Sequence, residues 1–171
     1  LGQYSTSSQV TGEAHAASYG GDVAGALTTA VLDMQNAYTE ASSRTADVVN
    51  LKAGLIGGET LAPGVYSFDT GITISEDLVF DGNIHDVWII KTTGDLTLAA
   101  NVEIELKNGA QAKNIFWVAA GNAAIGAGAS MAGTMLIFTD VLFATGSSLN
   151  GRIYSQTAAN LQMAKIMTAE E

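Results

Sequence analysis

The chain has 171 residues, no cysteine and a formal net charge of −10, and only 14% of its residues are charged. This length supports one domain with a core of its own, and the negative charge argues against nucleic acid and anionic membranes as partners. The lack of cysteine excludes a disulfide framework and thiol chemistry, and no apolar run reaches the ~18 residues of a membrane helix.

The first predicted element is a helix, which follows an N-terminal loop or cap portion over residues 1–21. Apolar residues recur at three- and four-residue steps from Leu27 to Tyr38 and form one stripe. Asp22 stands where an N-cap is expected. We therefore predict a helix over 22–44 that lies with its stripe on a flat surface.

After residue 48 the pattern changes to that of short strands. Ile72–Ile74, Leu96–Leu98 and Val141–Phe143 each place two apolar residues on one side and the middle residue on the other. The segments "VWII" and "IFWV" are apolar in both phases of the alternation, which predicts strands buried on both faces. The helix is the expected cover for that side.

Glycines recur at a fixed spacing in the second half of the chain. The spacing between Gly128 and Gly146 equals that between Gly133 and Gly151 (146 − 128 = 151 − 133). A period of roughly 20 residues, built of short strands and glycine turns, is typical of a β-solenoid. We expect triangular coils over 48–168, with glycines at the corners, in a single domain over 1–171.

Several blocks of the chain carry a family resemblance: "STSSQVTG", "LTTAVLDMQNAYTEASSRT", "GGETLAPGVYSF", "NGAQAKNIFW" and "SSLNGRIYSQTA". In this order they resemble the microbial ice-binding (antifreeze) proteins of discontinuous β-solenoid fold. The resemblance implies a mainly β fold, an irregular right-handed parallel β-helix with one long α-helix packed alongside. Family members usually begin with a further segment that supplies a coil and part of the cap, and this sequence lacks a match to it. Either the sequence is a fragment, or the protein closes its stack in another way. Because open solenoid ends are unpaired strand edges, we expect something to cover that end here.

The resemblance also implies that one flat side of the prism binds ice through a T-A/G-x-T/N pattern. Thr70–Thr73 and Thr157–Asn160 match this pattern, and Thr93–Thr97 resembles it with one extra residue. The coils at Gly121–Ala124 and Thr139–Leu142 match it less well. The predicted ice-binding residues form one outward column of Thr73, Thr97, Ala124, Leu142 and Asn160, a second of Ser75, Ala99, Gly126, Ala144 and Gln162, and a row at the strand starts of Thr70, Thr93, Gly121, Thr139 and Thr157.

These residues are small and uncharged, so the side is expected to be flat and uncharged. Threonine and serine on solenoid strands are nevertheless often β-formers that face water. The resemblance implies an ice crystal surface as the partner, with inhibition of ice growth and recrystallisation by a secreted monomer. The alternative is a non-catalytic adhesion or structural module of a larger extracellular assembly. A soluble ice-binding protein shapes crystals by itself, whereas a spacer does not partition into ice.

The carboxylates argue against an enzyme. Polysaccharide-cleaving β-helices need clustered carboxylates with a base or a metal, and here the acids are scattered, with Glu76–Asp77 and Glu103/Glu105 as the closest groupings. A Ca²⁺ site at these groupings would lack any loop signature. His15 and His85 are single and far apart, and no nucleophile motif or phosphate loop is present. We predict no catalytic residues, no metal and no cofactor.

Overall fold

A computed structural model describes residues 22–169, which fall into two compact units. The first unit ends at Ala37 and the second begins at Tyr38, so the division falls inside the one α-helix described, α1 (Val23–Ser43). The carbonyl of Asp22 accepts a hydrogen bond from the amide of Ala26 (3.0 Å), which is the backbone role of the predicted N-cap. The single domain over 1–171 stays a prediction, and the predicted cap portion over 1–21, with His15, lies outside the described residues. No described helix is long and apolar enough to span a bilayer.

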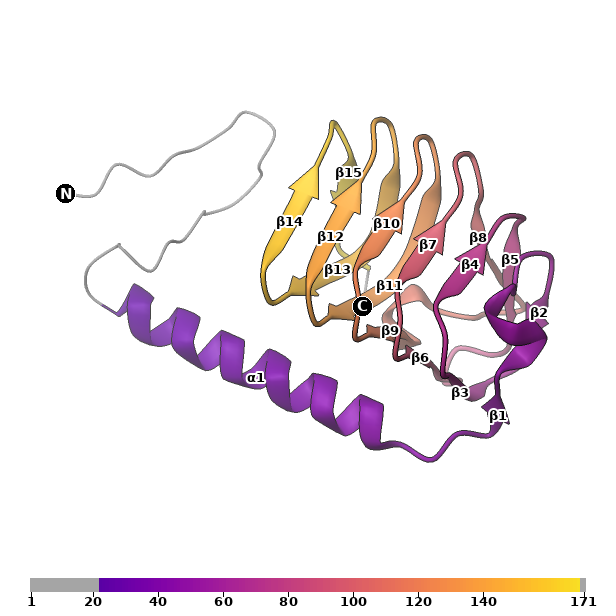
Figure 1. Cartoon of the computed structure of the whole chain (residues 1–171), viewed down its shortest axis with the longest axis horizontal. Coiled ribbons are helices and arrows are strands. Elements are labelled where there is room, and N and C mark those ends of the chain that lie inside the picture. The colour runs from indigo at the N-terminus through magenta and orange to yellow at the C-terminus, as the bar shows by residue number, and fades with distance from the viewer. Residues whose placement is uncertain (1–21, 170–171) are drawn as a thin grey trace. The chain divides into compact units, whose positions relative to one another are not determined.

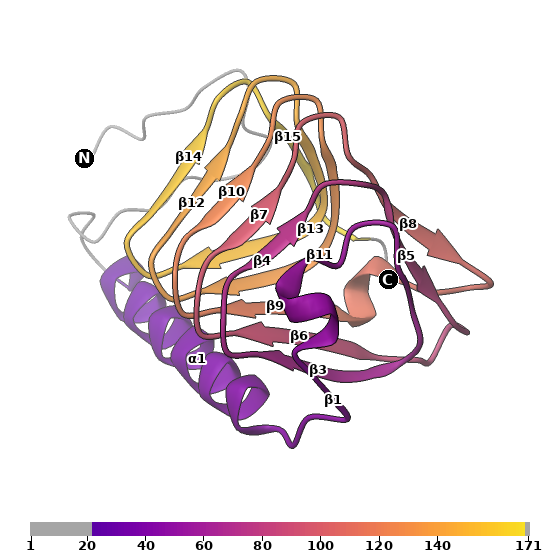
Figure 2. The same ribbon diagram turned by 45° about the vertical axis from the view of Figure 1, so that its right-hand side comes forward.

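The second unit is the predicted β-solenoid, in which every described strand pair is parallel (Figures 1 and 2). Figure 2 looks partly down the stack, and each coil there traces a triangle. Two short 3-10 turns, η1 (Leu51–Gly54) and η2 (Ala112–Asn114), interrupt the strands.

Three sheets form the sides of the triangle. Sheet A contains β1 (Val48–Val49), β3 (Gly64–Phe68), β6 (Trp88–Thr92), β9 (Ile115–Ala119), β11 (Ser130–Ile137), β13 (Ser148–Ser155) and β15 (Lys165–Met167). Sheet B contains β4 (Ile72–Ile74), β7 (Leu96–Leu98), β10 (Ala123–Ile125), β12 (Asp140–Phe143) and β14 (Ala158–Leu161). Sheet C contains β2 (Thr60–Leu61), β5 (Leu78–Asp81) and β8 (Ile104–Lys107).

The predicted glycine repeat is confirmed in the later coils. β11 pairs with β13 along its whole length, and this register places Gly133 beside Gly151. A Cβ built on Gly151 would lie 1.9 Å from the carbonyl oxygen of Gly133, so only glycine allows the two coils to approach this closely. Gly128 and Gly146 both have positive φ (68° and 74°), as predicted for corner glycines.

The earlier coils are longer than the later ones. Thr73 pairs with Thr97 and Thr97 with Ala124, and both separations exceed the one between Ala124 and its partner Leu142 (97 − 73 and 124 − 97, against 142 − 124). The step from sheet A to sheet B nevertheless has the same length in each coil. It runs from Val65 to Ile74, Ile89 to Leu98, Phe116 to Ile125, Thr134 to Phe143 and Arg152 to Leu161. All extra residues therefore lie between sheet B and the next strand of sheet A, on the sheet C side.

The interior of the prism is an aromatic and aliphatic core. Trp88 and Trp117 are fully buried, and each meets the ring of Phe80 edge-on, with centroids 5.6 and 5.7 Å apart. Each indole N–H has a backbone acceptor, Leu61 O at 3.1 Å for Trp88 and Ala132 O at 2.8 Å for Trp117. Buried tryptophans of this kind usually need such a partner, and these bonds link each wide coil to its neighbour.

The outer side of sheet A is covered where the C-terminal turns of α1 meet it. Tyr38 and Ala41 pack in one cluster with Val118 and Leu136, which point out of the sheet. Burial raises the pKa of the Tyr38 phenol. The prediction that "IFWV" is buried on both faces is confirmed for its last two residues, because Trp117 points into the core and Val118 points to the helix.

A lysine joins the end of α1 to sheet A. The Nζ atom of Lys91 donates hydrogen bonds to the carbonyl of Ser42 (2.8 Å) and to that of Arg44. The last carbonyls of a helix have no partner within it, and the C-terminal end of the helix dipole favours a cation. Lys91 therefore satisfies these groups and fixes where the helix ends on the sheet.

Candidate functional site

The first predicted column runs across sheet B without a break. The register pairs Thr73 with Thr97, Thr97 with Ala124, Ala124 with Leu142, and Leu142 with Asn160. In β4, β7, β10 and β12 the residues on either side of this column are buried, so the column itself faces outward. Figure 1 shows the five strands side by side, forming one side of the prism.

The second predicted column continues just past the strand ends. The amides of Ala99, Gly126, Ala144 and Gln162 each donate to the last carbonyl of the neighbouring strand in the preceding coil, at 2.8 or 2.9 Å. Ser75 begins this column, one residue after β4. A Cβ built on Gly126 would lie 2.5 Å from a backbone nitrogen of the preceding coil, so the close packing leaves no room for a side chain there. This half of the surface is therefore low and tightly packed.

The row at the strand starts lies at the corner between sheets A and B. The amide of Gly121 donates to Gly94 O (3.0 Å) and that of Thr157 to Thr139 O (3.2 Å). Extending the sheet B register by two residues places Thr70 beside Gly94 and Gly121 beside Thr139. The row is thus Thr70, Gly94, Gly121, Thr139 and Thr157, which are the predicted residues with one exception.

The exception is Thr93, whose placement on sheet B was wrong. Its amide donates to Phe68 O (3.1 Å), and the same line of sheet A continues through Ala120 and Phe138. Because the step from sheet A to sheet B is constant, the coil has no extra residue in the turn, and the motif "TGDLT" begins one residue too early to match. Thr93 belongs to the sheet A side, where Phe138 contacts Tyr38 at a centroid distance of 5.7 Å.

Sheet B has a further outward row that the sequence analysis did not include, and this row carries charge. The residues two positions before each member of the first column are Gly71, Asp95, Asn122, Asp140 and Ala158. Asp95 Oδ1 accepts the amide of Asn122 (2.8 Å), and Asn122 Oδ1 accepts the hydroxyl of Thr139. The expectation of a wholly uncharged side therefore needs correction, although period-two alternation alone would have identified this row.

Two carboxylates outside sheet B link neighbouring coils. Asp47 accepts the amide of Val65 and Asp77 that of Glu103, each at 2.8 Å. Asp77 and Glu103, singled out in two separate acidic groupings of the sequence, are thus joined by a side-chain-to-backbone bond between two neighbouring coils. In the part of the chain that the structure describes, no group of three or more histidines and acids could hold a metal ion.

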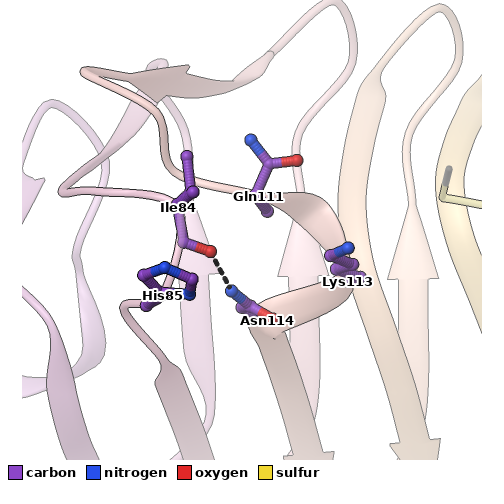
Figure 3. Close-up of a pocket in the computed structure, with 5 residues that line it drawn as sticks. All are labelled: Ile84, His85, Gln111, Lys113 and Asn114. Carbon is purple, nitrogen blue, oxygen red and sulfur yellow. Dashed lines mark hydrogen bonds between the residues drawn. The ribbon is translucent and has the colours of Figure 1, made fainter. Parts of the chain in front are cut away.

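One open pocket lies on another side of the molecule. It has a volume of about 380 Å³ and is lined by Ile84, His85, Gln111, Lys113 and Asn114. Figure 3 shows these side chains around the opening, with the amide of Asn114 donating to Ile84 O (3.0 Å). No carboxylate is among these lining residues, so His85 has no acid partner there for general acid–base chemistry. We assign no reaction to this pocket.

Comparisons with known proteins agree on one family. A family model described as ice-binding-like matches residues 1–167. The chain is 43% identical over 167 residues to an ice-binding protein of Flammulina populicola, which covers 97% of the chain and 68% of that protein. It is 46% identical over 138 residues to an ice-binding protein of Flavobacterium frigoris, covering 80% of the chain and 50% of that protein.

The solved structures give the same result. An ice-binding protein from an Arctic yeast, with antifreeze activity, matches with a TM-score of 0.94 at 35% identity. The match covers 98% of this chain and 74% of that structure. The chain thus spans between half and three quarters of the length of these three proteins.

Proposed function

The chain belongs to the ice-binding-like protein family, and on this premise we propose that it binds ice crystals through sheet B and inhibits their growth and recrystallisation. The observation that carries the choice of sheet is the register of the two columns. They place ten predicted residues, all uncharged, along the outer side of five adjacent coils. The outer side of sheet A is partly covered by Tyr38 and Ala41, and sheet C carries Asp81, Glu105 and Lys107.

The ligand is a crystal of the solvent, so each contact competes with ordinary hydration. Methyl groups of threonine and alanine order the neighbouring water without binding it tightly, while hydroxyls and backbone amides hold it by hydrogen bonds. Each contact is weak, but a rigid array has lost its conformational freedom on folding, and many weak contacts add up. Parallel strands about 4.8 Å apart set a regular spacing for this array.

Adsorbed molecules would act by shaping the ice front. The front can advance only between them, so it curves outward, and a curved front melts at a lower temperature than a flat one. Growth then stops within a gap between the melting and the freezing points. This mechanism needs the protein to stay bound and rigid and requires no covalent step.

The protein is accordingly proposed to be a non-enzymatic, extracellular monomer that works without cofactor or metal. Three observations support the absence of chemistry. The carboxylates of Asp47, Asp77 and Asp95 are each hydrogen-bonded to a backbone amide of the next coil. His85 has no acid partner in its pocket, and the proposed site itself is made mostly of threonine, alanine, serine and glycine. Ice that threatens a cell forms largely outside it, which is where such a protein would act.

The decisive experiment places a bulky ring in the middle of sheet B. We expect Thr97→Tyr and Ala124→Tyr each to abolish ice shaping and the gap between melting and freezing points, because the ring lifts the surface off the crystal. The fold should persist, since both side chains point outward. The readouts are crystal morphology, freezing-point depression and the fraction of protein taken into a growing ice hemisphere.

The matched control is Val79→Tyr, which places the same ring at an outward position of sheet C. It should leave activity unchanged, as should Glu40→Ala on the exposed surface of α1. If Thr97→Tyr and Ala124→Tyr shape ice as well as the parent does, the binding surface has been assigned to the wrong sheet.

A further inference from the structure

Sheet B continues for one more coil beyond β4, although no strand is present there. Leu55 forms an isolated parallel bridge with Thr73, and the amide of Ile56 donates to Thr73 O (3.2 Å). The separation of Leu55 from Thr73 equals that of Ala124 from Leu142 in the regular later coils (73 − 55 = 142 − 124). The constant step from sheet A to sheet B is kept as well, from Asp47 to Ile56, because the amide of Asp47 bonds Val65 O (2.8 Å).

The register decides which way Leu55 points. Ile56 is fully buried in the core, so the alternation turns Leu55 outward, and 65% of its surface is exposed. The segment directly before Leu55 is the η1 turn, in which Lys52 and Ala53 have positive φ (48° and 52°). The amide of Leu55 donates to Lys52 O (3.0 Å), which closes this turn directly beneath the bridge. The position of Leu55 is therefore fixed by the backbone on both sides.

This extra coil packs against β4 as closely as the later coils pack against one another. A Cβ built on Gly54 would lie 2.3 Å from the carbonyl oxygen of Gly71, and one built on Gly57 would lie 2.9 Å from the amide nitrogen of Ser75. No side chain separates this coil from β4, so Leu55 extends the first column and Gly57 extends the second. The ammonium group of Lys52 is engaged with Glu59 at 3.5 Å.

We propose that Leu55 is a sixth member of the first column and contacts ice. The binding surface of sheet B then begins directly after the η1 turn and not at β4. This inference rests on the function proposed above. Leu55 has most of its surface exposed and lies beside Thr73, so it adds apolar area to the first column. Gly57 has no side chain, so the second column stays low at this coil. Like the methyl groups of threonine and alanine in the first column, those of Leu55 would order neighbouring water without binding it tightly, and one more weak contact would add to the rigid array.

The test is Leu55→Lys, which puts a hydrated ammonium at the edge of the surface. We expect a roughly tenfold or greater loss in ice affinity, because the ammonium holds its hydration water in a geometry of its own. The loss is read as the protein concentration needed for half-maximal freezing-point depression. Uptake into an ice hemisphere should fall in parallel. A second variant, Leu55→Thr, should retain most of the activity, because it keeps an uncharged side chain with a methyl group at the same place.

The matched control is Val49→Lys. Val49 is an apolar residue at the same end of the solenoid with 60% of its surface exposed, but it lies on sheet A. It should leave ice binding unchanged, and all three variants should keep the parent's circular dichroism spectrum and melting temperature. Equal losses for the two lysine variants would attribute the effect to charge anywhere on the protein and overturn the inference.

Thr97→Tyr, measured alongside, separates the two proposals. If Thr97→Tyr abolishes binding while Leu55→Lys behaves like the parent, Leu55 does not contact ice and sheet B keeps its proposed function. If Thr97→Tyr also behaves like the parent, sheet B does not bind ice and both proposals are wrong.

Discussion

Two carboxylates lie on the outward side of sheet B, and their oxygens are used differently. The carboxylate of Asp95 accepts a hydrogen bond from the amide of Asn122 and so stabilises the corner between sheets A and B. The carboxylate of Asp140, at the start of β12, has no hydrogen bond or ion pair among residues 22–169. It is left to hold water in its own geometry, next to the column that contains Leu142. This hydration water opposes binding to ice, because the ice lattice requires a different geometry.

We therefore predict that Asp140→Asn increases ice-growth inhibition. The substitution keeps the size and removes the charge, and the gain should be modest, roughly twofold, since interactions of exposed charges are worth less than about 1 kcal/mol. Freezing-point depression at matched concentrations measures it. Glu103→Gln removes a negative charge from an exposed position outside sheet B and should have no effect. A result in which both variants equal the parent would show that ice does not reach the Asp140 row.

Single residues of the surface were predictable where the alternation decides their side. Thr73 and Thr97 stand between buried apolar neighbours, and that local pattern is enough to turn them outward. Thr93 resembles the first residue of a four-residue motif, but the constant step between sheets makes Gly94 the equivalent position. Leu55 could not be found, because the turn before it has positive φ at ordinary residues, which no composition signal predicts.

At the scale of elements, the junction between α1 and sheet A depends on one lysine. Lys91 is the outward-facing residue of β6 whose ammonium group reaches two carbonyls at the end of the helix. Hydrogen bonds to a charged group are stronger than neutral ones, and unpaired helix carbonyls are costly when they are shielded from water. The helix end is thus held by a charge-assisted contact in addition to the apolar cluster of Tyr38 and Ala41.

We predict that Lys91→Met lowers the free energy of unfolding by about 1–3 kcal/mol, the usual range for losing hydrogen bonds to a charged group. Urea unfolding followed by circular dichroism measures this change. Lys113→Met, which removes an exposed lysine from the same solenoid, should cost much less than about 1 kcal/mol. Ice shaping should survive in both, because neither residue lies on sheet B. Equal stability of the two variants would mean that water replaces Lys91 at the helix end without loss.

The elements with a clear period were predictable, and those defined by long-range contacts were not. The stripe from Leu27 to Tyr38 predicted α1, and the triplets predicted β4, β7 and β12. The two-residue strands β1 and β2 are too short to show a period, and they exist because β3 and β5 offer them a parallel edge. The hydrogen bonds of Lys91 join positions far apart in the chain, so no local pattern announces them.

On the scale of the whole solenoid, stability should vary along the stack. β11 lies between β9 and β13, and all of its residues after Ser130 are buried. β14 is exposed at each position and, within the described residues, pairs only with β12. Coils that contact only their neighbours have stabilities set by nearest-neighbour terms, so the coil that contains β14 should open before the coils around β11.

Hydrogen exchange followed by mass spectrometry tests this order. We predict that the amides of β9 and β11 exchange at least ~100-fold more slowly than those of β14, because opening of the terminal coil needs only a local transition. The amides of β6 should resemble those of β9, as a control from the same sheet. Uniform protection of all strands would instead mean that the solenoid opens as one cooperative unit.

The unequal distribution of chain length around the triangle has a practical consequence. Since the stretch from sheet A to sheet B is constant and each extra residue falls on the sheet C side, the loops at 82–87 and 108–114 are where this scaffold already tolerates additions. The chain has no cysteine, so a single thiol introduced in either loop would be a unique chemical handle. A fluorophore or a bead tethered there would leave sheet B unobstructed, and immobilised protein could be offered to ice in one known orientation.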